Sequence, residues 1–378
     1  MKKHILYIIL LALLTVGCSG RSGDDAVADF TDTVYAPRYA KGYTMMRRPG
    51  HESILISVRN AWQGCDTVAS QVLMLRGGEQ APAGFSGTVI DGDAKRIVTM
   101  SSTNIAMLDA VGEVDRVVGV SGLQYITNPK ITACRPADVG YAESIDYERI
   151  LSLKPDLVMI YGVDGESAMV GKLRELGVPY IYIGEYMEQS PLGKAEWVVP
   201  VAAIAGKYQK GVEFFTPIAR NYEALKNEVK QMAGTRPKVI VNAPYSGSWF
   251  MPTPDSYSGQ LVTDAGGQLL YDPKYSGVAV PVEMEAAWRM ASQADVWINP
   301  GQASSLDEVR AIAPKYTGVD VLTQGRVWNN NRIFTPAGGN DYFESGVIHP
   351  DRVLRDLISI FHPGFTPDTT FYYYKKLQ

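Results

Sequence analysis

The stretch DYERILSLKPDLV, residues 146–158, indicates the fold class of the chain. It opens with a helical run that starts at Asp146, and it ends in a strand-like run in which Asp156, directly after Pro155, leads into apolar residues. A helix that leads into a buried strand is the repeating unit of parallel α/β sheets. The pattern recurs as VEMEAAWRMASQADVWI, residues 282–298, with two more residues between its glutamate and its strand. The sequence therefore predicts two similar α/β lobes.

Apolar runs of strand length alternate with helical runs on both sides of these segments. In the first lobe the predicted strands are residues 96–100, 117–120, 156–160 and 178–183, and the predicted helices are 104–111, 146–153 and 168–176. In the second lobe the predicted strands are 238–242 and 295–299, and the predicted helices are 258–265 and 285–292. Continuous apolar strands are typical of a mainly parallel sheet with helices on both faces.

A single long helix is predicted between the lobes. Seven apolar residues between positions 212 and 232 recur every three or four positions, which is the spacing of an amphipathic helix. At ~1.5 Å per residue, a helix over residues 209–232 would be about 35 Å long, the length of a lobe. Pro217 lacks a backbone donor, so we expect a kink or a break near Phe214.

The N-terminus has the plan of a secretory signal peptide, because two lysines precede the apolar run 5–16. That run would cover about 18 Å as a helix, well short of a ~30 Å bilayer core. The sequence LTVGC, residues 14–18, resembles a bacterial lipobox with its leucine one position early. Lipidation of Cys18 is therefore predicted, and the alternative is an ordinary signal peptide with an incidental cysteine. A lipid anchor would hold the protein in the cell envelope, on a membrane outside the cytoplasm, with the periplasmic face expected.

The rest of the chain divides by composition. Short strand-like runs at 53–58 and 71–75, separated by turns, predict a small N-terminal β extension. The predicted division is a signal peptide at 1–17, a polar tether at 18–38, the β extension at 39–94, the first lobe at 95–200, the linker helix region at 201–236, the second lobe at 237–363 and a tail at 364–378.

Composition and charge exclude some classes of function. The 378 residues carry a formal net charge of −4, and 46% of them are hydrophobic. Such a chain can bury two cores of ordinary domain size. It lacks the basic excess that binding to nucleic acid requires, so no nucleic acid partner is expected. Cys65 and Cys134 have no framework spacing, and we expect two buried or partly buried thiols.

Five motifs in a fixed order resemble one family. They are RIVTMSS at 96–102, ERILSLKPDLV at 148–158, DAGG at 264–267, NDYFESG at 340–346 and HPDRVLRDL at 349–357. Together they resemble the helical-backbone binding proteins of ABC importers, which take up ferric siderophores, haem or vitamin B12. The resemblance covers about residues 95–363.

The resemblance implies a monomeric binding protein with two lobes, little hinge closure and a bulky ligand in the cleft. The expected ligand is an iron complex, either a ferric siderophore or haem, and a corrinoid is the alternative. The expected partner is an ABC permease dimer with its ATPase. In this family one glutamate on each lobe docks onto the permease, and the matching positions are Glu148 and Glu285, with Glu283 a competing candidate.

Ligands of parallel α/β lobes collect where loops follow the carboxyl ends of strands. The ligand-binding residues predicted by this rule are Ser101, Ser102, Thr103, Tyr125, Tyr161, Tyr245, Trp249, Phe250, Tyr257, Asp341, Tyr342 and Phe343. The segment 243–252 is the strongest candidate, because its Gly, Ser and Pro residues favour an irregular loop. Ligand carboxylates would also need arginine, for which Arg47, Arg48 and Arg135 are loop candidates.

Other functions are less well supported by the sequence. No HExxH, Walker loop, GxGxxG after a strand or GxSxG motif is present, so we expect neither an enzyme nor a cofactor. A zinc or manganese binding protein needs three or four converging ligands, whereas His51, His349 and His362 are scattered. An accessory lipoprotein that passes ligand to an outer-membrane transporter would share the fold, and only localisation would separate it.

Overall fold

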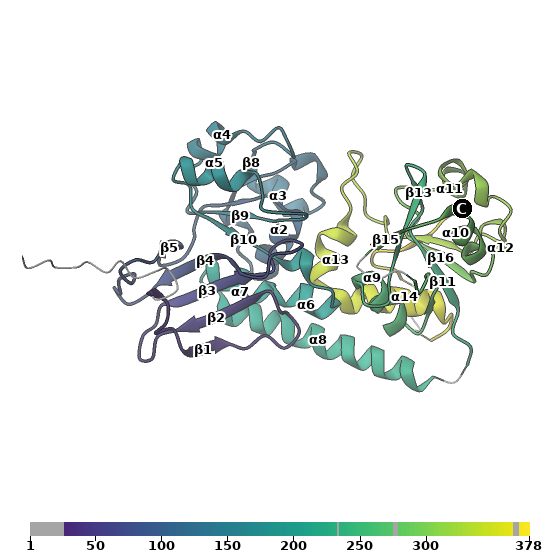
Figure 1. Cartoon of the computed structure of the whole chain (residues 1–378), viewed down its shortest axis with the longest axis horizontal. Coiled ribbons are helices and arrows are strands. Elements are labelled where there is room, and N and C mark those ends of the chain that lie inside the picture. Colours follow the sequence, from purple (N-terminus) through teal and green to yellow (C-terminus); the bar gives the residue numbers. More distant parts are fainter. Residues whose placement is uncertain (1–25, 233, 275–278, 366–369) are drawn as a thin grey trace, which may run out of the picture.

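The computed structural model describes residues 26–232, 234–274, 279–365 and 370–378. Figure 1 shows an N-terminal sheet, two α/β lobes and the long helix α8 (Tyr208–Gln231) that runs beneath both lobes. The predicted fold class is confirmed, since five-stranded and mainly parallel sheets form both lobes. The signal peptide and the lipidation site Cys18 lie outside the described residues. Within the described ranges, no helix is long and apolar enough to cross a bilayer.

The first lobe is a wholly parallel sheet with the strand order β10-β9-β6-β7-β8. Chain order reverses between β6 and β9, which are neighbours in the sheet. The elements of this lobe are β6 (Ile97–Thr99), α2 (Ser102–Ala110), β7 (Val117–Val120), α3 (Pro129–Cys134), β8 (Ala137–Asp138), α4 (Tyr147–Ser152), β9 (Leu157–Ile160), α5 (Met169–Glu175) and β10 (Tyr180–Tyr182), with 3-10 turns at Val114–Arg116, Leu123–Tyr125 and Glu185–Met187.

The second lobe has the strand order β14-β11-β16-β17-β18, and chain order reverses between β11 and β16. A separate antiparallel sheet, β12-β13-β15, flanks it. The elements are β11 (Lys238–Val241), β12 (Pro244–Tyr245), β13 (Ser248–Pro252), α9 (Tyr257–Asp264), β14 (Gln268–Leu269), β15 (Ala279–Val282), α10 (Met284–Ala291), β16 (Val296–Ile298), α11 (Leu306–Ile312), α12 (Asp320–Thr323), β17 (Val327–Asn329), α13 (Ser345–Ile348), α14 (Pro350–Phe361) and β18 (Lys375–Lys376), with 3-10 turns at Pro314–Tyr316 and Asp341–Phe343.

The two repeated sequence segments adopt the same local structure. In the first lobe α4 leads into β9, and in the second α10 leads into β16. Each of these strands lies in parallel beside the first strand of its own lobe, β6 or β11. The repeat therefore marks the same structural position in both lobes, as the sequence predicts.

Helix α8 is continuous, with Pro217 inside it, so the expected break near Phe214 is not found. The neighbouring residues Phe215 and Ile218 are buried, so packing holds both sides of the proline in one helix. The hydroxyl of Thr216 donates to the Val212 carbonyl at 2.7 Å and adds a local bond within this turn. Two short helices precede α8, namely α6 (Pro191–Glu196) and α7 (Val198–Ile204).

The N-terminal sheet is larger than predicted and begins inside the segment assigned to the tether. Its strands, in spatial order, are β1 (Asp32–Tyr35), β2 (Tyr43–Arg47), β3 (Ile54–Arg59), β4 (Val68–Leu75) and β5 (Thr88–Asp91). The tether prediction is wrong from residue 26 onward, because Phe30 is buried in a small cluster with Leu55 and Leu73. These apolar residues are far apart in the sequence, and strand pairing brings them into contact.

Buried carboxylates fix this sheet to the first lobe. Glu196 is fully buried and accepts hydrogen bonds from the Tyr35 hydroxyl at 2.7 Å and from the backbone N–H of Tyr39 and Ala40, each at 2.7 Å. Glu188 likewise accepts from the N–H of Gly42 at 2.8 Å. Charge-assisted bonds of this kind satisfy carboxylates that burial would otherwise destabilise.

The predicted tail belongs to the second lobe. Strand β18 pairs antiparallel with β17, and Tyr373, Tyr374 and Leu377 are buried. Asp356 on α14 accepts the backbone N–H groups of residues 372, 373 and 374 at 2.7–3.2 Å. A tail prediction fails here because the partners of this segment lie far away in the sequence.

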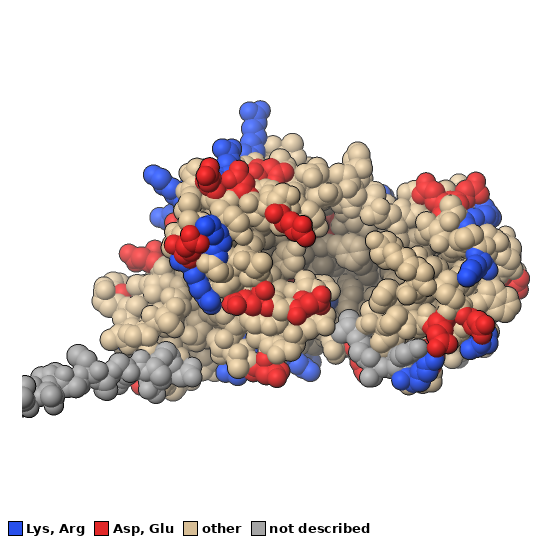
Figure 2. Space-filling view, turned by 45° about the horizontal axis from the view of Figure 1, so that its top comes forward, with Lys and Arg blue, Asp and Glu red and all other residues tan. Residues whose placement is uncertain are grey.

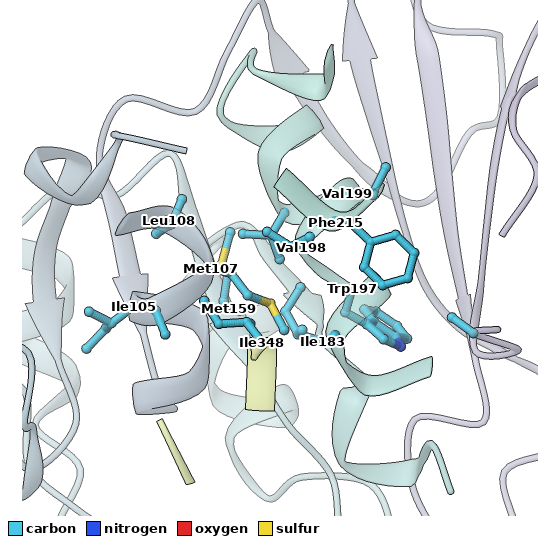
Figure 3. Close-up of a cluster of buried hydrophobic side chains, with 14 of the residues drawn as sticks. Ile105, Met107, Leu108, Met159, Ile183, Trp197, Val198, Val199, Phe215 and Ile348 are labelled. Carbon is cyan, nitrogen blue, oxygen red and sulfur yellow. The ribbon is translucent and has the colours of Figure 1, made fainter. Parts of the chain in front are cut away.

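One hydrophobic core extends across both lobes. Figure 3 shows Met107 and Met159 of the first lobe beside Val198 and Ile348, the last of which comes from α13 of the second lobe. Such a shared core opposes free movement of one lobe against the other. Both predicted thiols are confirmed as free, with Cys65 buried and Cys134 partly buried.

Candidate functional site

A cavity of about 760 Å³ lies between the two lobes. Figure 2 shows the corresponding hollow, with charged side chains mainly on the surfaces around it. Ser101 follows β6, Tyr161 follows β9, Asn242 follows β11 and Asn299 follows β16, and all four line the cavity. These are the strand pairs at which chain order reverses, where ligands of open α/β sheets bind. We call this cavity the interlobe pocket.

Asparagine suits the two strand ends in the second lobe. Asn242 and Asn299 have φ values of +68° and +56°, in the left-handed region that asparagine tolerates better than most residues. The side-chain amide nitrogen of Asn242 donates to the Phe250 carbonyl at 2.8 Å, and the backbone carbonyl of Asn242 accepts from the Trp297 indole at 2.7 Å. The chain reversal of the second lobe therefore leaves two side-chain amides at the pocket wall.

Aromatic rings form much of the remaining wall. Tyr125 and Tyr141 lie with their ring centroids 5.0 Å apart, and Tyr161 is 39% exposed on the same lobe. Phe334 and Phe343 come from the second lobe. Burial raises the pKa of the Tyr161 hydroxyl, so its neutral form is favoured. The wall thus offers large apolar faces with neutral polar tips.

The lobes touch directly at one end of the pocket. The Thr103 hydroxyl donates to the Phe343 carbonyl at 3.1 Å, and the Thr335 hydroxyl donates to the Gln124 carbonyl at 3.0 Å. A side chain at Gly339 would place Cβ only 1.8 Å from the carbonyl oxygen of Tyr125. Glycine is required at this position because the two loops approach so closely.

Glu344 is the buried acceptor in this contact. Its carboxylate accepts the backbone N–H groups of Thr127 and Asn128, each at 2.8 Å, across the lobe boundary. Burial nevertheless raises the pKa of Glu344 to about 7, against the lowering effect of these bonds. Beside it, Asp341 accepts from the hydroxyls of Thr127 at 3.1 Å and Ser345 at 2.8 Å.

The structure brings together seven of the twelve residues predicted to bind ligand. Those that line the interlobe pocket are Ser101, Ser102, Tyr125, Tyr161, Tyr257, Tyr342 and Phe343. Thr103 and Asp341 lie next to the pocket but are engaged in the contacts between the lobes. Tyr245 and Phe250 are exposed, at 76% and 45%, and lie outside the lining.

The prediction that Trp249 lies in a ligand loop is wrong. The segment forms the hairpin β12–β13, and Trp249 is fully buried. Its ring stacks on Trp297 at 5.3 Å and meets Tyr316 edge-on at 4.9 Å, and its indole donates to the Val241 carbonyl at 3.0 Å. The segment becomes a strand because β13 pairs with β15, a partner about thirty residues away.

Other lining residues were not predicted. They include Ser121, Tyr141, Asn242, Ser258, Asn299, Gln302, Asn330, Phe334 and Asn340. Asn242 and Asn299 carried a usable signal, since each is the polar residue that ends a predicted apolar strand. The loop around Phe334 carried none, because only the contact between the lobes places it there.

The described lining contains no Asp, Glu, Lys, Arg or His residue. Arg47, Arg48 and Arg135 all lie outside it, and Arg48 instead approaches Glu79 at 3.9 Å in the N-terminal sheet. Among the described residues, no three His, Cys, Asp or Glu side chains gather closely enough to hold a metal ion. The pocket therefore presents hydroxyls, amides and aromatic rings to its interior.

The two predicted docking glutamates lie on different lobes. Glu148 is in the first turn of α4 and Glu285 is in the first turn of α10, and both are exposed. Glu283 is also exposed and precedes α10 as its N-cap residue without a side-chain capping bond. Acidic residues at helix starts gain from the helix dipole whatever their further role.

Comparison with known proteins gives a family and several structural relatives. Residues 97–330 match the family described as "Periplasmic binding protein". An uncharacterized lipoprotein of Methanocaldococcus jannaschii is 27% identical over 289 residues, which is 73% of this chain and 67% of the relative.

Solved structures agree on the fold. The periplasmic haem-binding protein of Pseudomonas aeruginosa superposes with a TM-score of 0.57 at 16% identity, over 73% of this chain and 96% of that protein. The periplasmic vitamin B12-binding protein of Vibrio cholerae superposes with a TM-score of 0.53 at 14% identity, over 71% of this chain and 96% of that protein. The N-terminal sheet lies outside the family match, which begins at residue 97.

Proposed function

The chain belongs to the periplasmic binding protein family, and we propose that it is the solute-binding lipoprotein of an ABC importer. Its proposed ligand is a bulky metal-containing molecule, either an iron complex such as a ferric siderophore or haem, or a corrinoid. The observation that carries the proposal is the interlobe pocket, which opens at the chain-reversal points of both sheets. A binding role, with no chemical step, suits this arrangement.

The size and lining of the pocket support a bulky ligand. Its volume of about 760 Å³ falls in the upper part of the range for small-molecule sites. Aromatic faces on both lobes offer stacking surface to a flat ring system. The names of structural relatives that bind haem and vitamin B12 agree with a ligand of this size.

Docking to a permease dimer is proposed through Glu148 and Glu285. Exposed carboxylates on both lobes can form charge-assisted bonds with basic residues on the two halves of a symmetric partner. Anchoring through Cys18 to a membrane outside the cytoplasm is also proposed. The lipobox-like sequence and the lipoprotein relative support it.

Ligand capture can be tested on a soluble chain that starts at residue 19. Equilibrium dialysis against haem, ferric siderophores and cyanocobalamin, read by ligand absorbance, should find one ligand that binds saturably. Tyr161→Ala, inside the pocket, should weaken that binding at least tenfold, whereas Tyr245→Ala, outside it, should not. Binding that both variants leave intact would refute the interlobe pocket as the site.

Docking can be tested separately in the reconstituted importer. Glu148→Ala and Glu285→Ala should each reduce ligand-stimulated ATP hydrolysis while ligand affinity stays unchanged. Glu283→Ala is the matched control, because it removes a neighbouring exposed carboxylate. A loss of stimulation in the control alone would transfer the docking role to Glu283.

A further inference from the structure

The interlobe pocket carries no formal charge on its described lining. The polar groups that it presents are hydroxyls, as in Ser101, Ser121 and Tyr161, and side-chain amides, as in Asn242 and Gln302. Such groups both donate and accept hydrogen bonds but cannot neutralise a charge. The lining is therefore suited to a ligand that presents the same kinds of group.

Three carboxylates that bond to loops around the pocket are engaged by the protein itself. Asp138 accepts the backbone N–H groups of Gly122 at 3.2 Å and Leu123 at 3.0 Å. Glu344 and Asp341 are held in the lobe contact described above. None of the three belongs to the lining. Their role is to hold loops in place, and only neutral groups remain to contact a ligand.

One buried pair of opposite charge lies behind the wall. Lys194 donates to the backbone carbonyls of Glu185 at 2.9 Å and Tyr186 at 2.8 Å, and its ammonium group lies 5.4 Å from the centroid of the Tyr257 ring. Burial raises the pKa of Glu185 and lowers the pKa of Lys194. Both residues lie outside the lining, and each offsets the other, so the pair supplies no counter-charge to a ligand.

An anionic ligand would be poorly held in such a pocket. A carboxylate or catecholate group loses its hydration on burial and normally regains that energy from arginine or lysine. Direct bonding of ferric iron to a tyrosine would also require the phenolate form. The raised pKa of Tyr161 opposes that form. A metal held here would need its coordination completed by the ligand molecule itself.

We infer that the ligand of the interlobe pocket is an uncharged molecule whose surface is rich in amide or hydroxyl groups, and that anionic iron complexes are excluded. This inference rests on the proposed function and narrows its ligand. An amide-bearing corrinoid and a neutral ferric hydroxamate both fit the description. Haem with two carboxylates and a ferric tris-catecholate do not.

The test compares probes that differ in charge but little in shape. Cyanocobalamin should be paired with its monocarboxylic acid, in which one side-chain amide is replaced by a carboxylate. A neutral ferric hydroxamate should be paired with an anionic ferric tris-catecholate, and haem added as a further anion. Equilibrium dialysis at pH 7.5 on the soluble chain should show binding of at least one neutral probe, with its anionic counterpart at least tenfold weaker.

A variant tests the same point from the protein side. Gln302→Glu keeps the shape of the side chain and places a negative charge in the lining. It should lower the affinity of the anionic probe by a larger factor than that of the neutral probe, because only the anionic probe meets a like charge. Equal losses for the two probes would contradict the charge argument. Asn330→Asp provides a second position in the lining should the first variant fail to fold, as judged by circular dichroism.

The outcomes separate this inference from the proposed function. Binding of haem or the tris-catecholate that is as tight as any neutral probe, and that Tyr161→Ala weakens, would overturn the charge argument and leave the transport role standing. Absence of binding by every probe to folded protein would overturn the proposed ligand class, and the inference with it.

Discussion

Replacing Glu344 with glutamine tests the balance of forces at the contact between the lobes. The Glu344 side chain is 1% exposed, and its pKa is raised from 4.5 to about 7, chiefly because burial disfavours the charged form. The folded protein therefore keeps a proton between pH 4.5 and 7 that the unfolded chain has released. Linkage then makes the unfolding free energy fall as pH rises through this window.

The magnitude follows from the same shift. The rise of the pKa from 4.5 to about 7 corresponds to roughly 3 kcal/mol in total, most of which falls between pH 5 and pH 8. Glutamine does not titrate and keeps one oxygen for the N–H groups of Thr127 and Asn128. The free energy of unfolding of the wild type, relative to that of Glu344→Gln, should thus fall by about 2–3 kcal/mol from pH 5 to pH 8.

Urea unfolding, followed by tryptophan fluorescence, gives the free energy of unfolding of the wild type and of Glu344→Gln at pH 5 and at pH 8. The difference in unfolding free energy between wild type and variant cancels the contribution of other carboxyl groups with a raised pKa. Asp356, whose pKa is raised to about 6, is one of them. Glu148→Gln, at an exposed site, controls for removal of one negative charge. A difference that stays constant or grows with pH would refute the reasoning, because the two N–H bonds would then outweigh burial.

Four further substitutions have expected outcomes. Trp249→Ala should lower the unfolding free energy by about 3–5 kcal/mol in urea titration, because it empties a buried site, and a loss under 1 kcal/mol would contradict that packing. Asp356→Asn should speed hydrogen exchange at the C-terminal strand by removing a shared acceptor, and unchanged exchange would show that strand pairing alone holds it. Glu196→Gln should expose the segment around residues 36–42 to limited proteolysis, and an unaltered digestion pattern would argue against its anchoring role. Gly339→Ala should separate the loop contact at Tyr125 and enlarge the radius of gyration in small-angle scattering, whereas Gly318→Ala, whose Cβ would meet nothing within 4 Å, should not.

The lobes could be predicted because their signal is local. Each helix and strand of the repeated segments is encoded within about fifteen consecutive residues, by apolar spacing and by the Asp that opens the strand. The long helix was equally visible from its periodicity, but the effect of Pro217 was not. Whether a proline breaks a helix depends on burial of its neighbours, and neighbours in space are absent from a periodicity argument.

The site could be predicted in part. The strand-end rule found Ser101 and Tyr161 because it needs only the strands. It missed Asn242 and Asn299, because the predicted strands 238–242 and 295–299 included both residues. Trp249 was misplaced because a hairpin that pairs with a distant strand looks, in sequence, like a loop rich in Gly, Ser and Pro.

The C-terminal segment shows the same limit. Strand β18 contains two lysines and has no apolar alternation of its own. It is held by pairing with β17 and by the carboxylate of Asp356, which lies sixteen residues away from Tyr372. A hydrophobic pattern in the sequence shows which side chains a segment buries. The hydrogen bonds that the backbone of this segment forms with β17 and Asp356 leave no such pattern.

The direct bonds between the lobes bear on how fast a ligand would come and go. Thr103, Thr335 and Glu344 join the lobes through direct bonds between protein groups, so no ligand is needed to bridge the lobes and capture requires no closing movement. The association rate is then set by diffusion and by removal of water from the pocket. Dissociation differs, since a ligand bound in a preformed site leaves slowly unless the two lobes are moved apart. A partner that binds both lobes and separates them would therefore raise the dissociation rate. The bonds at this contact would set the free energy that the separation requires.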